Sequence, residues 1–257
     1  MKFRPCIDIH NGRVKQIVGG SLSDQGSMAV ENFISEQDAS FYAALYKNDH
    51  IKGGHIILLN PNGTEYYRQD CEQAKKALRE YPGGLQIGGG ITEENAADFL
   101  KDGASHVIVT SYVFKDGIIH YDNLKKLVKA VGKNRVVLDL SCRKSEGEYF
   151  IVTDRWQKFT TVRVNLDTLN ALTDYCDEFL VHAVDVEGKS SGIEQELVKI
   201  LGDWGKIPIT YAGGVGSFQD LSLLKELGQD KLDVTIGSAL DLFGGPMKYT
   251  DVVSQLR

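Results

Sequence analysis

Arg4-Pro-Cys-Ile-Asp-Ile-His10 is an apolar run that carries one carboxylate, Asp8, and Arg135-Val-Val-Leu-Asp-Leu-Ser141 repeats this pattern around Asp139. Each run has the length and apolar content of a buried parallel strand. The second run begins about half a chain after the first, and such internal self-similarity indicates a duplicated architecture. The sequence therefore predicts two related halves, each with one acid at the end of its first strand.

Two further pairs of segments extend the repeat. Leu85-Gln-Ile-Gly-Gly-Gly-Ile91 matches Ile209-Thr-Tyr-Ala-Gly-Gly-Val215. Val107-Ile-Val-Thr-Ser111 matches Val234-Thr-Ile-Gly-Ser238. Each half thus carries an acid and two small-residue turns that follow strands. Backbone N–H groups in such turns bind anions, so we expect two carboxylates and two phosphate sites that face each other.

Short apolar runs alternate with amphipathic segments along the chain, which indicates parallel strands joined by crossover helices. The expected strands are residues 3–9, 55–59, 85–87, 106–110, 135–140, 179–184, 207–211 and 232–236. The expected helices are residues 39–47, 70–79, 93–101, 122–131, 194–204 and 218–227. Eight strands in 257 residues predict an α/β fold, a (β/α)8 barrel of two half-barrels, with residues 1–257 in a single domain. An open doubly wound sheet would give no reason for the half-length repeat.

The composition excludes several classes of partner. The net charge is −6, whereas nucleic acids and membrane surfaces bind clustered Lys and Arg. No apolar run approaches the roughly 18 residues of a membrane span, and the first residues lead into a strand without a signal peptide. We expect a cytoplasmic protein that binds neither nucleic acid nor membrane. Cys6, Cys71, Cys142 and Cys176 lack metal-ligand spacing, so we expect reduced thiols, no metal and no cofactor.

Small-residue turns after strands predict the two phosphate sites, because a backbone without Cβ atoms approaches a phosphate closely. The first site is expected at Gly88, Gly89, Gly90, Thr110 and Ser111. A helix is expected to start near Thr92, with its positive dipole end toward this anion. The second site is expected at Ala212, Gly213, Gly214, Gly237 and Ser238. These residues follow the last two strands, the usual phosphate site of such barrels.

Two connections are too long for ordinary loops of this fold. Residues 10–37 and 141–160 each follow an acid-bearing strand, and the second holds Arg143, Arg155 and Trp156 around a small hairpin. Long loops in compact domains are commonly functional lids. In a barrel, the loops after strands lie on the face that holds the active site. We therefore expect both connections to close over a ligand.

Acidic side chains at strand ends are the candidate catalytic groups. Asp8 and Asp139 lie at equivalent positions of the two halves, each between phosphate turns. Paired carboxylates serve as general base and general acid when their surroundings separate their pKa values. The sixth strand adds Asp185 and Glu187 at a glycine turn, and it places His182 near its end, as a core residue or a substrate contact.

Several of these segments resemble the paired isomerase and cyclase barrels of histidine biosynthesis. They are Pro5-Cys-Ile-Asp-Ile-His-Asn-Gly-Arg-Val14, Gln86-Ile-Gly-Gly-Gly-Ile91, Ala212-Gly-Gly214 and Ile236-Gly-Ser-Ala239. The resemblance covers nearly the whole chain and implies duplicated half-barrels that act on a substrate with a phosphate at each end. Leu138-Asp-Leu-Ser-Cys-Arg143 and Thr153-Asp-Arg-Trp-Gln157 are similar to the eukaryotic isomerase branch.

The cyclase branch is the nearest alternative, because its first strand reads almost the same. That branch carries a functional lysine where this chain has Gln16, with Lys15 one place earlier. A shift of one residue turns a strand side chain to the other face, so the isomerase is favoured. The bacterial isomerase pattern has Asp-Gly-Thr at the sixth-strand turn and a threonine on that strand. This chain has Glu187-Gly188-Lys189 and His182 there, and Asp185 is the alternative acid if the alignment slips by one.

The resemblance implies an Amadori rearrangement of a bisphosphorylated N-ribosyl aminoimidazole carboxamide, from aminoaldose to aminoketose. Asp8 is implied as the base that takes the C2 proton. Asp139 is implied to donate a proton to the ribose ring oxygen or to position the donor, and Glu187 competes for that role.

Trp156 is expected to stack on the imidazole carboxamide, with Arg143 or Arg155 closing over it. The expected partner is this small molecule alone, bound by a monomer. Two other functions stay open. The cyclase would need a glutaminase partner that supplies ammonia. A non-catalytic sugar-phosphate-binding barrel would keep the glycine turns without needing both acids, and the presence of Asp8 and Asp139 counts against it.

Overall fold

The computed structural model describes residues 1–17 and 31–256. In this part of the chain, eight strands pair in parallel in the order β1-β4-β5-β6-β7-β11-β12-β13. Their bounds are Cys6–His10 (β1), Gly54–Leu58 (β4), Leu85–Gly88 (β5), Val107–Val109 (β6), Val136–Asp139 (β7), Glu178–His182 (β11), Ile209–Ala212 (β12) and Leu232–Thr235 (β13). Each overlaps a predicted strand.

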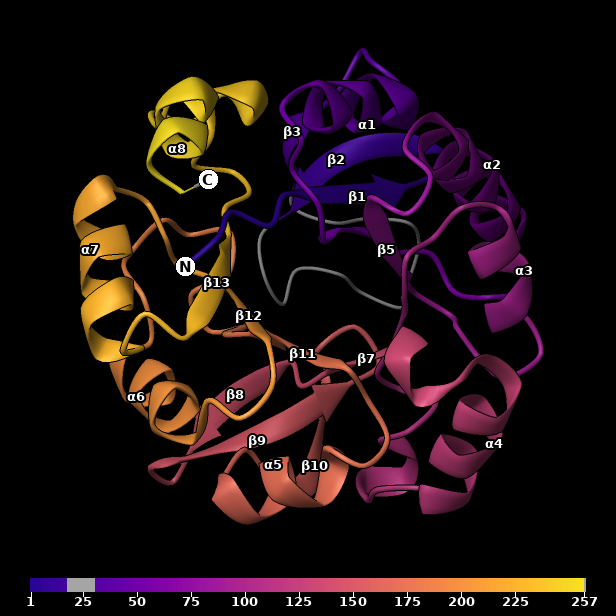
Figure 1. Cartoon of the computed structure of the whole chain (residues 1–257), viewed down its shortest axis with the longest axis vertical. Helices are drawn as coiled ribbons and strands as arrows, with labels where there is room; N and C mark the ends of the chain where they lie inside the picture. Colours follow the sequence, from indigo (N-terminus) through magenta and orange to yellow (C-terminus); the bar gives the residue numbers. More distant parts are fainter. Residues whose placement is uncertain (18–30, 257) are drawn as a thin grey trace.

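Helices follow these strands and surround them as a ring (Figure 1). Their bounds are Ala39–Asn48 (α1), Glu65–Glu80 (α2), Ala96–Lys101 (α3), Tyr121–Val131 (α4), Leu166–Leu172 (α5), Gln195–Trp204 (α6), Phe218–Leu227 (α7) and Tyr249–Gln255 (α8), with 3-10 turns at Lys115–Gly117, Lys133–Arg135 and Asp241–Phe243. Helix α7 has its predicted bounds, because the Ser217 hydroxyl caps it by accepting the Asp220 N–H at 3.2 Å.

Hydrogen bonds between the two ends of the sheet close the barrel. Phe3 forms a parallel bridge with Val234 on β13. The Arg4 N–H donates to the Val234 carbonyl at 2.8 Å, and the Val234 N–H donates to the Lys2 carbonyl at 2.9 Å. The segment before β1 is thereby joined to the last strand. The predicted (β/α)8 barrel is confirmed.

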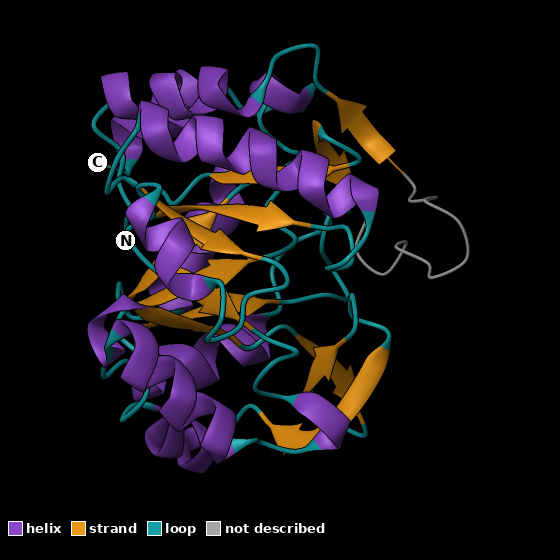
Figure 2. Cartoon of the chain, turned by 90° about the vertical axis from the view of Figure 1, so that its right-hand side faces the viewer, coloured by secondary structure: helices purple, strands orange, loops and turns teal. Residues whose placement is uncertain are grey.

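Additional strands follow both acid-bearing strands. Strands β2 (Arg13–Ile17) and β3 (Glu31–Ile34) extend the sheet antiparallel from β1. Strands β8 (Cys142–Ser145), β9 (Glu148–Thr153) and β10 (Lys158–Arg163) form a separate antiparallel sheet after β7. Both additions lie beyond the same end of the barrel strands, opposite the chain termini (Figure 2). The expected long connections thus contain strands, while residues 18–30 of the first lie outside the described residues.

Apolar side chains form one core between strands and helices and a smaller one inside the barrel. The smaller core contains Ile108, Val137 and Leu180, with Ile57 packed against it. These residues come from β6, β7, β11 and β4, and alternate residues of a strand face opposite sides of a sheet. The inner cluster therefore fills the middle of the barrel and forms the floor of the space above it.

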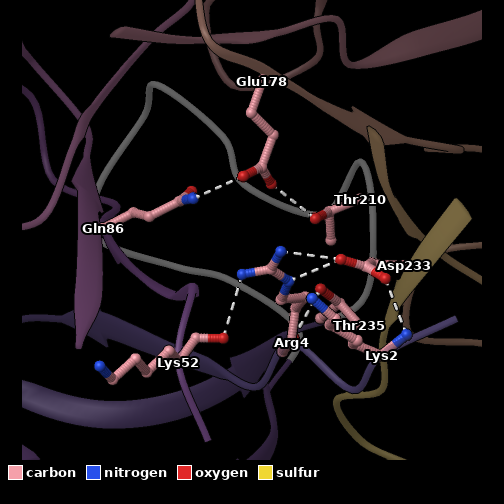
Figure 3. Close-up of polar contacts among 8 residues, drawn as sticks. All are labelled: Lys2, Arg4, Lys52, Gln86, Glu178, Thr210, Asp233 and Thr235. Carbon is pink, nitrogen blue, oxygen red and sulfur yellow. Dashed lines mark hydrogen bonds and ion pairs between the residues drawn. The ribbon is translucent and has the colours of Figure 1, made fainter. Parts of the chain in front are cut away.

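Polar side chains fill the end of the barrel interior that lies near the termini. Gln86 Nε2 donates to Glu178 Oε2 at 3.0 Å, and Thr210 Oγ1 donates to Glu178 Oε1 at 2.7 Å (Figure 3). All three side chains are buried. Beside them, Arg4 Nε donates to Asp233 Oδ2 at 2.8 Å. Both oxygens of the buried carboxylate are satisfied, so this end is closed by a hydrogen-bonded layer.

Candidate active site

A cavity of about 520 Å³ lies at the carboxyl ends of the barrel strands. Its walls include the predicted residues Asp8, Gly89, Gly90, Thr110, Ser111, Asp139, Arg155, Trp156, His182, Glu187 and Ala212. A small cavity of about 20 Å³ is lined by the predicted residues Glu187, Gly213, Gly214, Gly237 and Ser238. Glu187 and Thr235 line both cavities, so the two are neighbours. Most of the predicted site residues are therefore brought together.

Asp139 is buried at the end of β7, where hydrogen bonds hold its carboxylate. Oδ1 accepts the Ser141 N–H at 2.8 Å and the Ser141 hydroxyl at 2.7 Å, and it lies 3.3 Å from His182 Nδ1. Oδ2 accepts the Thr110 hydroxyl at 3.2 Å. Burial by itself would raise the pKa of Asp139, but the charge of His182 and these hydrogen bonds lower it. Asp139 therefore stays ionised at neutral pH.

His182 pairs with Asp139 from the end of β11. Burial would lower the pKa of His182, but the charge of Asp139 and the hydrogen bond to it raise this pKa to about 9. His55 on β4 lies edge-on to His182, with ring centroids 5.9 Å apart. Burial, followed by the charge of His182, lowers the pKa of His55 to about 3. At neutral pH one histidine is an imidazolium and its neighbour is uncharged.

Asp8 and Glu187 are carboxyl groups with raised pKa values. Removal from water, followed by the negative charge of Glu187, raises the pKa of Asp8 to about 7. Burial also raises the pKa of Glu187, against the opposing charge of His182. Among the described residues, the buried Oε2 of Glu187 has no hydrogen-bond partner. Two coupled carboxyl groups in one buried site ionise one after the other, so the pair retains a proton near neutral pH.

The first glycine turn follows β5. Gly89 and Gly90 have left-handed φ angles of +96° and +66°, and a Cβ at Gly89 would lie 2.1 Å from the Leu58 carbonyl oxygen. Only glycine accommodates this approach. Nearby, the Ser111 hydroxyl accepts the Asp154 N–H at 3.3 Å. The turn presents bare backbone to the large cavity.

Helix α3 begins at Ala96, later than predicted. The Thr92 N–H is bound by Asn95 Oδ1 at 2.9 Å, and the Glu94 N–H is bound by the Thr92 hydroxyl at 3.3 Å. Such local side-chain bonds compete with helix formation. The predicted helix start at this glycine turn is therefore wrong, and an anion there would depend on the turn's own N–H groups.

The second glycine turn repeats the geometry of the first. Gly213 and Gly214 have φ angles of +122° and +76°. A Cβ at Gly213 would lie 2.8 Å from the Ala183 carbonyl oxygen, and one at Gly214 would lie 2.0 Å from the Gly192 carbonyl oxygen. The duplication seen in the sequence is thus a duplication of backbone conformation, including the close contact with the preceding barrel strand.

The loop between β9 and β10 covers part of the large cavity. Asp154, Arg155 and Trp156 all have left-handed φ angles, at 50°, 57° and 68°. This conformation costs L-residues roughly 1–2 kcal/mol each. Trp156 Nε1 donates to the Ser141 hydroxyl at 3.0 Å, and its ring lies 5.8 Å from the His182 ring. A strained loop therefore holds the indole next to the charged histidine.

Gly88 and Arg143 lie outside the described cavity walls. A Cβ at Gly88 would meet the Ile57 side chain at 2.9 Å, so its small size serves strand packing. Arg143 Nε donates to Asp185 Oδ1 at 2.8 Å, and the Lys144 N–H donates to Asp185 Oδ2 at 2.9 Å. Asp185, the alternative acid, thereby joins the β8–β10 sheet to the loop after β11.

His55 and Asn60 also line the large cavity and were missed from the sequence. The Asn11 N–H donates to Asn60 Oδ1 at 2.7 Å, which links the turn after β1 to the loop after β4. The signal for Asn60 was its place just after a strand, where barrel enzymes carry functional residues. His55 begins an apolar run and gave no such signal.

The remaining candidate groups are the cysteines and the side chains that could bind a metal ion. The cysteines are free thiols, and burial, followed by the charge of Asp8, raises the pKa of Cys6 well above its usual range. No group of three His, Cys, Asp or Glu side chains in residues 1–17 and 31–256 is arranged to hold a metal ion. Among those residues, the helices are too short or too polar to cross a membrane.

A family model described as "Histidine biosynthesis protein" matches residues 2–245. The chain belongs to this family. It is 54% identical over 258 residues to the chloroplastic 1-(5-phosphoribosyl)-5-((5-phosphoribosylamino)methylideneamino) imidazole-4-carboxamide isomerase of Medicago truncatula, covering 99% of this chain and 81% of that protein. Imidazole-4-carboxamide isomerases from Yarrowia lipolytica and Saccharomyces cerevisiae are 46% and 45% identical, covering 98% and 97% of this chain and 96% of each protein. The predicted membership of the isomerase branch is confirmed.

The register of β2 bears on the cyclase alternative. Gln16 Nε2 lies 3.4 Å from Asp8 Oδ2 and 3.6 Å from Cys6 Sγ. Lys15, the next residue along the strand, places its Nζ 3.5 Å from His10 Nδ1. The side chain that contacts the Asp8 carboxylate is thus an amide, while the lysine contacts His10. The position that the resemblance associates with a cyclase lysine is occupied by glutamine.

Proposed function

We propose that this protein catalyses the Amadori rearrangement of a bisphosphorylated N-ribosyl aminoimidazole carboxamide, from aminoaldose to aminoketose. The single observation that supports this most is the duplicated site. Two left-handed glycine turns, at Gly89 and Gly213, border neighbouring cavities that also contain Asp8 and Asp139. A substrate with a phosphate at each end would place its sugar beside these acids. The names of the relatives supply the reaction.

Asp8 is the proposed base. The ribose ring must open to a Schiff base, and a base must then remove the C2 proton to give an enolamine that becomes the ketone. A pKa of about 7 makes Asp8 a stronger base than an exposed aspartate, yet leaves it largely ionised slightly above neutral pH. Gln16, at 3.4 Å, orients the carboxylate.

The acid that opens the ring must hold a proton at neutral pH. Asp139 is poorly suited, because its surroundings keep it ionised. Its proposed role is to position its neighbours. His182 lines the large cavity with a pKa raised to about 9, so it satisfies this requirement. Glu187 lines the same cavity, and burial raises its pKa, so it stays the competing donor.

Trp156 and Arg155 are proposed to hold the heterocycle. Both line the large cavity on the strained loop between β9 and β10. An indole stacked on an aromatic ligand contributes on the order of 1 kcal/mol beyond its buried area. Arg143 would reach the ligand only after leaving Asp185.

An absorbance assay tests the function directly. Purified protein is given the aminoaldose bisphosphate together with a known cyclase and ammonia, which consume the aminoketose. Consumption of the aminoaldose that requires this protein supports the proposal, whereas consumption of the aminoketose with ammonia and no added cyclase would assign this chain to the cyclase. Absence of conversion, with tight sugar-phosphate binding, would favour a non-catalytic barrel. The monomeric state and the cytoplasmic location stay predictions, and sedimentation velocity tests the first.

A further inference from the structure

We propose that His182 is the proton donor of this reaction and gives its Nε2 proton to the ribose ring oxygen, while Asp139 holds the ring in place. The inference rests on the proposed isomerase function and assigns one role within it. It concerns the end of β11, where the buried His182 faces Asp139.

The orientation of the ring is the first argument. His182 Nδ1 lies 3.3 Å from Asp139 Oδ1 and 3.4 Å from the Ser141 hydroxyl. A carboxylate at one ring nitrogen fixes the orientation of an imidazole and leaves the other nitrogen for chemistry. Among the described residues, Nε2 of His182 has no hydrogen-bond partner, and this atom is not buried. Because His182 lines the large cavity, this nitrogen is open to a ligand.

Asp139 itself is not free to donate. Its Oδ1 accepts two hydrogen bonds from Ser141 and faces His182, and its Oδ2 accepts one from Thr110. Protonation of Asp139 would remove the negative charge that the Ser141 donors and the facing imidazolium stabilise. The carboxylate is therefore built to remain an anion that stabilises an imidazolium.

Glu187 is the weaker candidate, because its Oε2 is buried and has no hydrogen-bond partner among the described residues. It lines the small cavity beside Gly213 and Gly237 as well as the large one. A phosphate in the small cavity would be repelled by an ionised carboxylate at that border. Glu187 therefore lies at the border of the expected phosphate site, which leaves ring opening to His182.

The charges around His182 come from several elements. Asp139 on β7, Asp8 on β1 and Glu187 after β11 all favour the imidazolium, while burial and the neighbouring His55 on β4 oppose it. The balance raises the pKa of His182 to about 9, whereas that of Asp8 is about 7. Between these values the donor holds its proton and the base lacks one, which is the combination that catalysis needs.

The proton transfers balance over one turnover. The Nε2 proton of His182 moves to the ring oxygen as the bond between C1 and that oxygen breaks, and it remains on the new hydroxyl. Asp8 takes the C2 proton and delivers it to C1 as the enolamine becomes the ketone. The C2 hydroxyl proton returns to His182. Both side chains end as they began, and no redox partner is required.

The test compares the dependence of kcat/KM on pH in the wild type, His182→Ala and Glu187→Gln. We expect an alkaline limb near pH 9 in the wild type, from the pKa of His182. His182→Ala should lose roughly 10²–10⁴-fold in rate together with this limb.

Added imidazole should restore part of the rate of His182→Ala, with an alkaline limb at the pKa of imidazole. Rescue by 4-methylimidazole should move that limb. Glu187→Gln should keep an alkaline limb, moved to lower pH because the variant lacks a negative charge that raises the pKa of His182. A limb that persists in His182→Ala or disappears in Glu187→Gln would overturn the assignment.

A second measurement does not depend on the folding of His182→Ala. Nitrogen NMR of the histidine rings in the intact protein should show His182 protonated at pH 7 and titrating with the alkaline limb. Asp139→Asn, which removes the facing anion, should move both the titration and the limb to lower pH. A neutral His182 at pH 7 would overturn the proposal. If the wild type fails to convert the substrate, the proposed function fails instead, and the NMR titration still reports on His182.

Discussion

The carboxyl group of Asp8 is removed from water beside Glu187, and both conditions oppose its ionisation. Its pKa rises from 3.8 to about 7, first through removal from water and then through Glu187. A raised carboxyl pKa means that the folded protein binds this proton more tightly than the unfolded chain does. The contribution of Asp8 to stability is therefore present below pH 4 and is lost as the pH rises through about 7.

Asp8→Asn should separate activity from stability. The amide cannot act as a base, so we expect kcat to fall by roughly 10²–10⁴-fold with the substrate still bound. Because the amide resembles the protonated acid, the variant should melt at a higher temperature than the wild type at pH 8, but not at pH 4. Calorimetry and the coupled assay measure the two effects. Asp233→Asn is the matched control, since it breaks the ion pair with Arg4 and should lower stability without lowering kcat. Near-normal turnover by Asp8→Asn would contradict the assignment of Asp8 as the base.

Glu187→Gln should shift the acid limb of the kcat/KM profile. Glu187 raises the pKa of Asp8 through its charge, so a neutral amide should let Asp8 ionise at lower pH. We expect the acid limb, near pH 7 in the wild type, to move downward in the variant. An unchanged acid limb would show that the two carboxyl groups are not coupled. Glu196→Gln, at an exposed ion pair with Lys144, is a control of the same chemistry.

At the level of elements, the site depends on turns that only glycine can form. Gly89 and Gly213 both bring their backbone against the carbonyl of a preceding strand end. The repeat in the sequence was enough to predict these turns, because a left-handed conformation and a close approach demand the same residue each time. The late start of α3 could not be read in the same way, since it depends on which N–H groups Thr92 and Asn95 bind.

Alanine at either glycine turn should weaken one end of the binding site. Gly89→Ala and Gly213→Ala each place a Cβ against a carbonyl oxygen, so the turn must shift away from the bound phosphate. We expect product affinity to fall on the order of tenfold or more, equivalent to about 1.4 kcal/mol. Gly132→Ala is the control, because its φ of +83° imposes similar strain while its Cβ meets nothing within 4 Å. Calorimetric titration with the aminoketose product would contradict the model if all three variants bound alike.

Asp70 joins two loops of the site from helix α2. It is fully buried and accepts the Gly12 N–H at 2.7 Å and the Asn60 N–H at 3.4 Å. Asp70→Ala should leave these donors unpaired, at a cost of roughly 1–3 kcal/mol in the free energy of unfolding. Asp70→Asn keeps a carbonyl acceptor and should lose less. Urea unfolding of the two variants measures the difference, and equal losses would show that the hydrogen bonds contribute little.

For the whole molecule, the alternation of strands and helices was sufficient to predict the barrel, and the repeat was sufficient to place the site at one end of it. The protonation states could not be predicted from the sequence, because the charged groups that determine them come close together only in the folded chain. Asp8, Asp139, His182 and Glu187 come from three strands and a loop, and each shifts the pKa of another. The ion pair between Arg143 and Asp185 could not be predicted for the same reason.

The most direct test of the account is turnover of the aminoaldose bisphosphate carrying either hydrogen or deuterium at ribose C2. The wild type should form the aminoketose, and the deuterated substrate should react more slowly if C2 proton removal limits the rate. Asp8→Asn should form product at least roughly 10²-fold more slowly from either substrate. Conversion by Asp8→Asn at the wild-type rate, or no conversion by the wild type, would contradict the claim that this barrel is an isomerase with Asp8 as its base.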